Sequence, residues 1–207
     1  IIITSQKFEY DKIKNYLFLE ENIKVDDQKN QTIILADKVF YNRLKEEIIS
    51  SGYTEIMVNN SYTIKTESIR FDRKKNEIFS ETDTSIIDKD KNILSSKELV
   101  LNINSKVLKA KDVTIDYVDG SKSSFDSFFG DLNSKKFLGK DAKYIFNKKA
   151  FGNINNDPRI YGNVLKRDEN QIILSKGIFT TCKKRDGCPP WKMKAERITH
   201  DKEKKII

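Results

Sequence analysis

The residue types best suited to chemistry in this 207-residue chain lie near its C-terminal end. Cys182 and Cys188 are separated by five residues, and His200 is the only histidine. These are zinc-ligand types, but the gap is wider than usual finger spacing and a fourth ligand is missing, so we predict no metal site. A disulfide between the two cysteines is favoured for an exposed loop outside the cytoplasm. A bond to a cysteine elsewhere and two reduced thiols are the alternatives.

The remaining residues give little indication of an enzyme active site. The sequence has no nucleophile-elbow, Walker or dinucleotide-binding motif. Its carboxylates occur in turn-like and surface-like contexts, where we expect them to be solvated. No pair of them is distinguished as facing a groove, as a polysaccharide-cleaving β-helix would require. We therefore predict a protein that is not an enzyme and uses no cofactor.

A short sequence motif that repeats about every thirty residues indicates how the chain is built. Each copy is an alternating apolar segment closed by Asp or Asn, then a polar turn and a second apolar segment. The closing residues Asp11, Asn42, Asp72 and Asn102 are spaced by 31, 30 and 30 residues, and a fifth copy begins at Leu132. Such a period predicts stacked copies of one supersecondary unit.

The periodicity inside each copy predicts strands. In the segment 62–92, Ile69 and Phe71 precede a polar turn at 73–76, and we expect the next strand to run from Ile78 to Ile86 before a turn at 88–92. Alternation with period two, closed by Asn, Asp, Ser and Lys, is typical of half-buried strands joined by hairpins. The prediction is an all-β fold with two antiparallel strands per repeat.

Alternation also predicts which side chains point inward. Equivalent positions in successive copies carry large apolar residues, which would form one apolar stripe along the stack. This stripe is either a filled core or the lining of an apolar channel for an elongated ligand, and the sequence leaves both open. The predicted inward residues are Phe8, Tyr10, Val39, Tyr41, Ile69, Phe71, Leu99, Leu101, Val113 and Ile115.

The net charge of +8 raises the question of nucleic acid. The basic residues are spread over turns such as 73–75, 89–91 and 135–136 and over outward strand positions, and along the chain they are mixed with Asp and Glu. Dispersed charge of this kind marks solvated faces and protected sheet edges, so we predict no nucleic-acid binding. The excess positive charge still favours anionic partners, including phosphorylated lipids.

The regular pattern is interrupted in three places. We expect a turn at 119–124, a longer loop at 151–158 and a loop from Cys182 to Trp191, with a last strand at 191–198. We interpret these as insertions in a single domain of residues 1–207, regular over about 1–146 and irregular over about 147–207. The chain starts at Ile1 and lacks a signal peptide and any apolar run near 18 residues, which suggests a mature or excised segment.

The C-terminal residues carry a family resemblance. The run from Gly177 to Cys182, followed by Trp191, Ala195, Ile198, His200, Asp201 and Glu203, resembles the end of the periplasmic domain of the LptD (organic solvent tolerance) family of lipopolysaccharide-assembly proteins. Upstream, 36–41 and 110–113 are similar to the OstA-type repeats that this family shares with LptA and LptC. The repeats occur in all three proteins, whereas the segment 182–201 favours LptD.

The resemblance implies an open, twisted antiparallel β-jellyroll, also called a β-taco, in the periplasm of a Gram-negative bacterium. Lipopolysaccharide would move along it with its acyl chains inside. It further implies edge-strand pairing with an LptA-type bridge protein at the N-terminal end and a downstream outer-membrane barrel that contains an LptE-type lipoprotein. Cys182 matches the family cysteine that bonds to the barrel, whereas Cys188 does not belong to the family pattern.

The function predicted from the sequence is therefore lipopolysaccharide transport to the outer membrane through an apolar groove. Two alternatives remain. One is a soluble bridge protein like LptA or LptC, and the other is a passive β-solenoid that serves as a scaffold or adhesion module. The solenoid would have a filled core and no response to lipid, which separates it from the other two.

Overall fold

The computed structural model describes residues 1–183, 189–201 and 203–204. The regular secondary structure of these residues is β-strand, and the strands pair in antiparallel fashion. The all-β antiparallel prediction is confirmed. No helix in this part of the chain is long and apolar enough to cross a membrane.

The chain divides into two compact units, residues 1–110 and 111–207. Strand β11 (Val107–Asp116) crosses the division. Unit 1 contains β1 (Ile2–Thr4), β2 (Lys7–Asp11), β3 (Tyr16–Asp27), β4 (Thr32–Asn42), β5 (Glu47–Val58), β6 (Tyr62–Asp72), β7 (Glu77–Ser80), β8 (Thr84–Asp88), β9 (Ile93–Ser96) and β10 (Glu98–Asn102). Unit 2 contains β12 (Lys122–Asp131), β13 (Lys136–Ile145), β14 (Arg159–Arg167), β15 (Gln171–Thr180) and β16 (Met193–Asp201).

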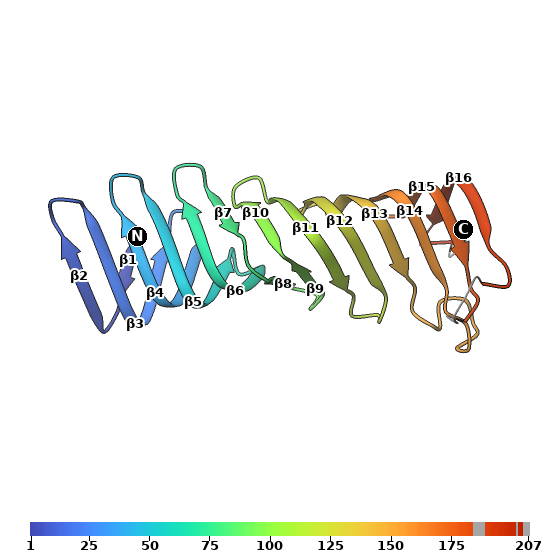
Figure 1. Cartoon of the computed structure of the whole chain (residues 1–207), viewed down its shortest axis with the longest axis horizontal. Coiled ribbons are helices and arrows are strands. Elements are labelled where there is room, and N and C mark those ends of the chain that lie inside the picture. The colour runs from blue at the N-terminus through green and yellow to red at the C-terminus, as the bar shows by residue number, and fades with distance from the viewer. Residues whose placement is uncertain (184–188, 202, 205–207) are drawn as a thin grey trace. The chain divides into compact units, whose positions relative to one another are not determined.

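In unit 1 the main path of the sheet runs β1-β3-β4-β5-β6-β7-β10, from blue to green in Figure 1. Strand β2 pairs with β3 beside this path, and β8 pairs with β6 and β9. Turns at 12–15, 43–46, 73–76 and 103–106 form one margin, here called edge A, and turns at 28–31, 59–61 and 89–92 form the opposite margin, edge B. Along edge A the backbone at Asn15, Glu46, Asn76 and Lys106 has positive φ. This spacing explains the thirty-residue period, because each copy of the repeat must bring its polar turn back to edge A.

Turns of edge A are also hydrogen-bonded to one another. The N–H of Arg43 donates to the carbonyl of Asn15 at 3.1 Å, that of Arg73 to Glu46 at 3.1 Å, and that of Ile103 to Asn76 at 2.8 Å. Each bond joins residues about one repeat apart. The polar turns therefore form a ladder of their own, which fixes the register between successive copies.

The long strands β3 to β6 of unit 1 bend near their middle. The strand pairing shifts between Glu20 and Ile23, between Ala36 and Lys38, and between Ser51 and Thr54. Such bulges bend a strand and increase its twist. At Gly52 the backbone has a φ of 79° and passes so close to Asp37 that a side chain would collide with it, so glycine suits this corner.

Further along unit 1 the bend becomes a break. The sequence predicted one strand from Ile78 to Ile86, but β7 ends at Ser80 and β8 starts at Thr84. Hydroxyl groups gather at this corner, where Thr84 Oγ1 lies 2.8 Å from the Thr82 carbonyl oxygen and 2.8 Å from Ser80 Oγ. The continuous strand was therefore wrong because the corner interrupts it.

Unit 2 repeats this construction with longer connections. Residues 122–124, predicted as part of a turn, belong to β12, because the turn itself needs only 117–121. The long loop expected around 151–158 is present between β13 and β14, and the last strand is β16, slightly later than predicted. Bends recur where Asp141 and Lys176 have positive φ.

Candidate functional site

Two rows of inward side chains cross unit 1 between edge A and the bend. The pairing register places the predicted positions of alternate strands in the same rows, with the returning strands contributing residues between them. One row is Phe8, Leu19, Val39, Ser50, Ile69, Ser80 and Leu99, and the other is Tyr10, Leu17, Tyr41, Ile48, Phe71, Ile78 and Leu101.

Most of the predicted inward residues are buried. Val39, Tyr41, Ile69, Phe71, Leu99 and Leu101 in unit 1 are at most 9% exposed, and Val113 and Ile115 in unit 2 are also buried. Phe8 and Tyr10 are exceptions, with 72% and 41% exposure. They pair with Leu19 and Leu17 from the terminal strand β2, where no further strand covers them. Whether these residues line a lipid path stays a prediction.

A third row lies on the other side of the bend and was not singled out from the sequence. It consists of Val25, Ile34, Ile56, Ile64, Ile86 and Leu94, all of them buried. Val25, Ile56 and Ile86 are spaced by the same thirty or so residues as the predicted rows. The period could therefore have identified this layer, had it been applied to both halves of each strand.

One ion pair shows that the sheet of unit 1 is folded in half. The pairing register places Asp27, Thr32, Val58 and Tyr62 together at edge B. β6 then runs eleven residues from Tyr62 to Asp72, about 33 Å if straight. Yet Arg73, which follows Asp72, places its Nε 2.7 Å from Oδ2 of Asp27. The two edges therefore meet, and the three apolar rows lie inside the fold.

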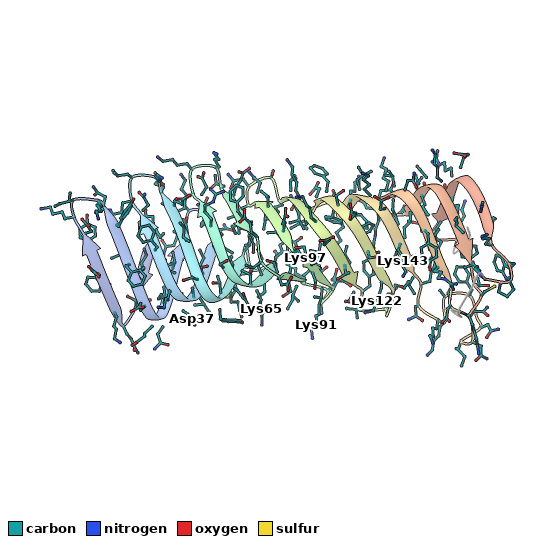
Figure 2. All side chains as sticks on the ribbon, in the orientation of Figure 1. Asp37, Lys65, Lys91, Lys97, Lys122 and Lys143 are labelled. Carbon is teal, nitrogen blue, oxygen red and sulfur yellow. The ribbon has the colours of Figure 1, made fainter. Side chains whose placement is uncertain are left out.

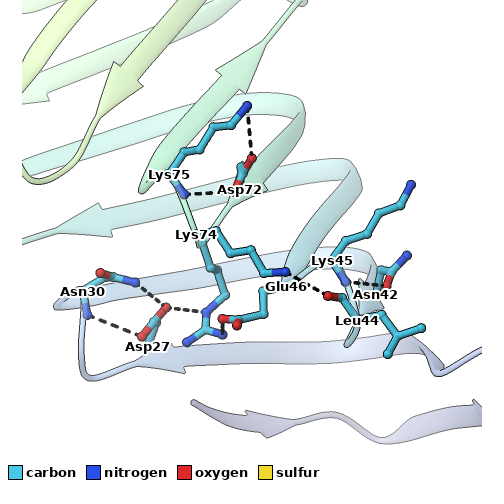
Figure 3. A network of polar contacts seen from close by, with 10 residues as sticks. Asp27, Asn30, Asn42, Leu44, Lys45, Glu46, Asp72, Lys74 and Lys75 are labelled. Carbon is cyan, nitrogen blue, oxygen red and sulfur yellow. Dashed lines mark hydrogen bonds and ion pairs between the residues drawn. The ribbon is translucent and has the colours of Figure 1, made fainter.

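We call the line where edges A and B approach each other the mouth of unit 1, and the Asp27–Arg73 pair the clasp. Asp27 Oδ2 also accepts a hydrogen bond from the Asn30 side chain at 2.9 Å, and Arg73 Nη1 donates to Glu46 Oε2 at 3.0 Å (Figure 3). The Arg73 and Asp27 side chains are only 10% and 1% exposed. The mouth is thus closed by a buried, hydrogen-bonded ion pair.

This pair corrects two expectations from the sequence. The sequence predicts a solvated turn position for Arg73 and surface positions for the carboxylates, but the side chains of Arg73 and Asp27 are only 10% and 1% exposed. Burial alone raises the pKa of Asp27, but hydrogen bonds from Arg73 and Asn30 outweigh it, so the pKa lies below its ordinary value. Asp27 is therefore held ionised against its guanidinium partner.

Other charged side chains do behave as the sequence predicted. Lys65 pairs with Glu55 at 3.4 Å while remaining 42% exposed, and in unit 2 Lys122 pairs with Asp116 while 65% exposed (Figure 2). Such exposed pairs contribute little to stability. They keep the outer face hydrated without defining a site.

A polar hollow of about 550 Å³ also opens in unit 1, at the bend. Glu20, Glu21, Asp37 and Lys38 are among its lining residues. Lys38 already pairs with Glu20 at 3.0 Å, and Glu21 pairs with Lys7. Because these charges satisfy one another, the apolar interior is the better candidate site.

Unit 2 also brings opposite ends of its strands together. The guanidinium carbon of Arg167, at the end of β14, lies 5.1 Å from the ring centroid of Tyr117. Tyr117 belongs to the turn between β11 and β12. His200 near the end of β16 contacts the ring of Phe146, which follows β13, with the ring centroids 5.2 Å apart. Here aromatic packing and a cation–π contact take the place of the ion pair.

The interior of unit 2 is more aromatic than that of unit 1. Phe125, Phe128 and Phe137 form a cluster with ring centroids 5.1–5.7 Å apart. Gly139 pairs with Phe128, and a side chain at this glycine would collide with the Phe125 ring. The ring is accommodated because the backbone at Gly139 carries no side chain.

The cysteine region is described in part. Cys182 is partly buried, its thiol lies 3.7 Å from the Trp191 carbonyl, and its own carbonyl accepts a hydrogen bond from Arg159 at 2.6 Å. Cys188 lies outside the described residues, so the disulfide between them stays a prediction. Among the residues described here, no cluster of three metal-ligand types occurs.

Comparison with known proteins gives likenesses to solved structures but no family. No protein-family model matches the chain, and a search of curated proteins found no match. A similar solved structure is that of LptH, the LptA-homologous periplasmic component of the lipopolysaccharide transport device of Pseudomonas aeruginosa. That match has a TM-score of 0.44 and 15% identity, and it covers 53% of this chain and 80% of LptH.

Proposed function

We propose that this chain is a lipopolysaccharide-transport module of the periplasm, which shelters the acyl chains of the lipid inside its folded sheet. The observation that carries the proposal is the set of three apolar rows enclosed between edges A and B of unit 1. Their residues are mainly Ile, Val, Leu and Phe, with no buried acid or base among them. Each acyl CH₂ transferred from water to such an interior is stabilised by about 0.8 kcal/mol.

The geometry also suits a lipid with a large polar head. Acyl chains would lie between the two layers of unit 1, while the sugar and phosphate groups would remain outside the mouth. Edge A carries Arg43, Lys45, Lys74 and Lys75 in its turns. Cationic side chains there favour a phosphorylated head group. No step of this function requires a bond to be made or broken, so the proposal is a binding protein and not an enzyme.

Binding of lipopolysaccharide with and without its acyl chains tests the proposal. We expect the purified chain to bind intact lipopolysaccharide and to lose at least tenfold in affinity for the chemically deacylated form, because only the intact form can fill the interior. Fluorescence anisotropy with labelled lipopolysaccharide measures both. Equal affinity for the two forms would mean that surface charge does the binding, and binding of neither would favour the passive β-solenoid.

The proposal extends to a bridge protein at the N-terminal end. Among the strands that the structure describes, β1 and β2 pair only with β3, so the other edge of each is available, and Phe8 on β2 is 72% exposed. An exposed edge next to apolar side chains suits strand addition by an LptA-type partner. A photo-crosslinker placed at Phe8 should capture that partner in cells. Absence of any adduct there, with adducts elsewhere on the chain, would count against pairing at this edge.

The finer proposal is that the chain is the periplasmic part of an LptD-type protein of the outer membrane, which works with an LptE-type lipoprotein. Its support is the Cys182 segment, in which the Thr180 hydroxyl donates to the Trp191 carbonyl at 2.8 Å and holds the cysteine next to the tryptophan. Non-reducing peptide mapping tests it. A disulfide from Cys182 to a barrel cysteine is expected, and a Cys182–Cys188 bond as the final state would contradict it.

A further inference from the structure

The interior of unit 1 is closed in the structure. Val25, Ile34, Ile56 and Ile64 are each 0% exposed, so not even a water-sized sphere reaches them. An acyl chain is wider than a water molecule. The two layers must therefore separate before such a chain can lie between them.

Several contacts resist this separation, and the clasp is placed directly across the mouth. Every hydrogen bond in the edge A ladder, such as Arg73 N–H to the Glu46 carbonyl, joins turns on the same side and is unaffected when the edges part. The Arg73 Nε to Asp27 Oδ2 contact joins opposite sides. Opening of the mouth at this point stretches that contact and leaves the edge A ladder intact.

The clasp is also built to be reversible. Each member keeps a partner on its own edge, because Asp27 retains Asn30 and Arg73 retains Glu46 when they separate. Neither charge would then be left buried without a hydrogen bond, which is the usual obstacle to breaking a buried ion pair. The guanidinium would also become available to a phosphate oxygen, which it can bind with the same fork of N–H groups.

From this geometry we infer that the Asp27–Arg73 clasp is the gate of the acyl-chain site in unit 1. It holds the mouth shut in the empty molecule and opens when a phosphorylated, acylated lipid enters. This inference rests on the proposed function, since a gate needs a ligand. It assigns to Asp27 and Arg73 a positioning role on the two edges rather than direct contact with the acyl chains.

A removable covalent lock tests the gate. In a background with Cys182→Ser and Cys188→Ser, the pair Asp27→Cys and Arg73→Cys is bridged with a short, reducible thiol crosslinker. We expect the bridged protein to lose at least tenfold in affinity for lipopolysaccharide, and reduction to restore it. Folding of the bridged protein is checked by its circular dichroism spectrum.

A matched pair on a single edge provides the control. The Lys74 ammonium donates to the Leu44 carbonyl at 3.1 Å, so Leu44→Cys and Lys74→Cys join two neighbouring turns of edge A. The same crosslinker at this pair should leave affinity within twofold of that of the same Leu44→Cys/Lys74→Cys variant before bridging, because both states lack the Lys74 charge equally. Equal binding by the locked and reduced Asp27/Arg73 proteins would overturn the gate alone. Failure of the native chain to bind lipopolysaccharide would overturn the proposed function and, with it, the gate.

Discussion

Replacing Arg73 with alanine should lower the free energy of unfolding by about 3–5 kcal/mol, which would make it among the most damaging single changes in unit 1. The substitution leaves Asp27 charged inside the mouth with only Asn30 to satisfy it. Chemical denaturation followed by circular dichroism measures the loss. The double variant Asp27→Asn with Arg73→Leu should recover most of it, because no unpaired charge is then buried.

Arg43 offers a matched control, since it occupies the same turn position one repeat earlier and belongs to the same ladder. Its side chain is exposed and only reaches the Tyr10 hydroxyl, at 3.1 Å. Arg43→Ala should therefore cost no more than about 1 kcal/mol, as is usual for surface positions. Similar losses for Arg43→Ala and Arg73→Ala would contradict a special role for the clasp.

The same pair predicts a pH dependence with a definite sign. The pKa of Asp27 is lower in the folded protein than its ordinary value of 3.8, so the folded state binds this proton less readily than the unfolded state. Its stabilising contribution is fully present above about pH 4 and is lost as the pH falls through the folded pKa. The native chain should thus lose more stability on acidification than the Asp27→Asn variant does.

Shortening Phe71 to alanine should cost about 3–5 kcal/mol of unfolding free energy. Its ring is 0% exposed and lies in the row with Tyr41, Ile48 and Ile78, so truncation leaves a cavity that both layers would have to collapse to fill. Thermal and urea unfolding measure the change. Loss of acyl-dependent lipid binding should accompany it, because the row would no longer be continuous.

Phe79 is the matched control for this cavity. It lies on the adjacent strand β7 but on the opposite face, where the Arg70 guanidinium covers its ring at 4.0 Å. Phe79→Ala should cost about 1 kcal/mol, the value of an exposed cation–π contact and some surface packing. If both phenylalanines cost the same, the assignment of inner and outer faces would be wrong.

The repeat period predicted the parts of the fold that are local. A polar turn every thirty residues requires the backbone to reverse at Asn15, Glu46, Asn76 and Lys106, and alternation between these turns determines which side chains share a face. Those features depend on neighbouring residues and on the spacing of two along a strand. The rows containing Val39, Ile69 and Leu99 followed from them directly.

The bend could not be predicted in the same way. It results from bulges such as the one between Ser51 and Thr54, where no strong sequence signal other than Gly52 marks the position. The continuous strand predicted from Ile78 to Ile86 failed for this reason, because Thr82 continues the alternation although the backbone turns there. The alternation of apolar and polar residues predicts which face of the sheet a residue occupies, but it does not predict where the sheet bends.

Arg73 illustrates the limit for the functional site. Its turn resembles that of Arg43 in sequence, and both arginines follow an Asp or Asn that closes a strand. Only the folding of the sheet brings Arg73 to Asp27, 46 residues away, and the same folding leaves Arg43 at the surface. Contacts between opposite edges depend on the bend, so the repeat pattern could not predict the clasp.

A photo-crosslinking scan along β6 shows whether the inward rows of unit 1 contact acyl chains. A small aliphatic diazirine amino acid would be placed in turn at Ile64, Lys65, Ile69, Arg70 and Phe71, and the protein irradiated with lipopolysaccharide. We expect lipid adducts at the buried positions Ile64, Ile69 and Phe71 and few at the outward Lys65 and Arg70. Uniform labelling along the strand, or adducts confined to the outward positions, would contradict it.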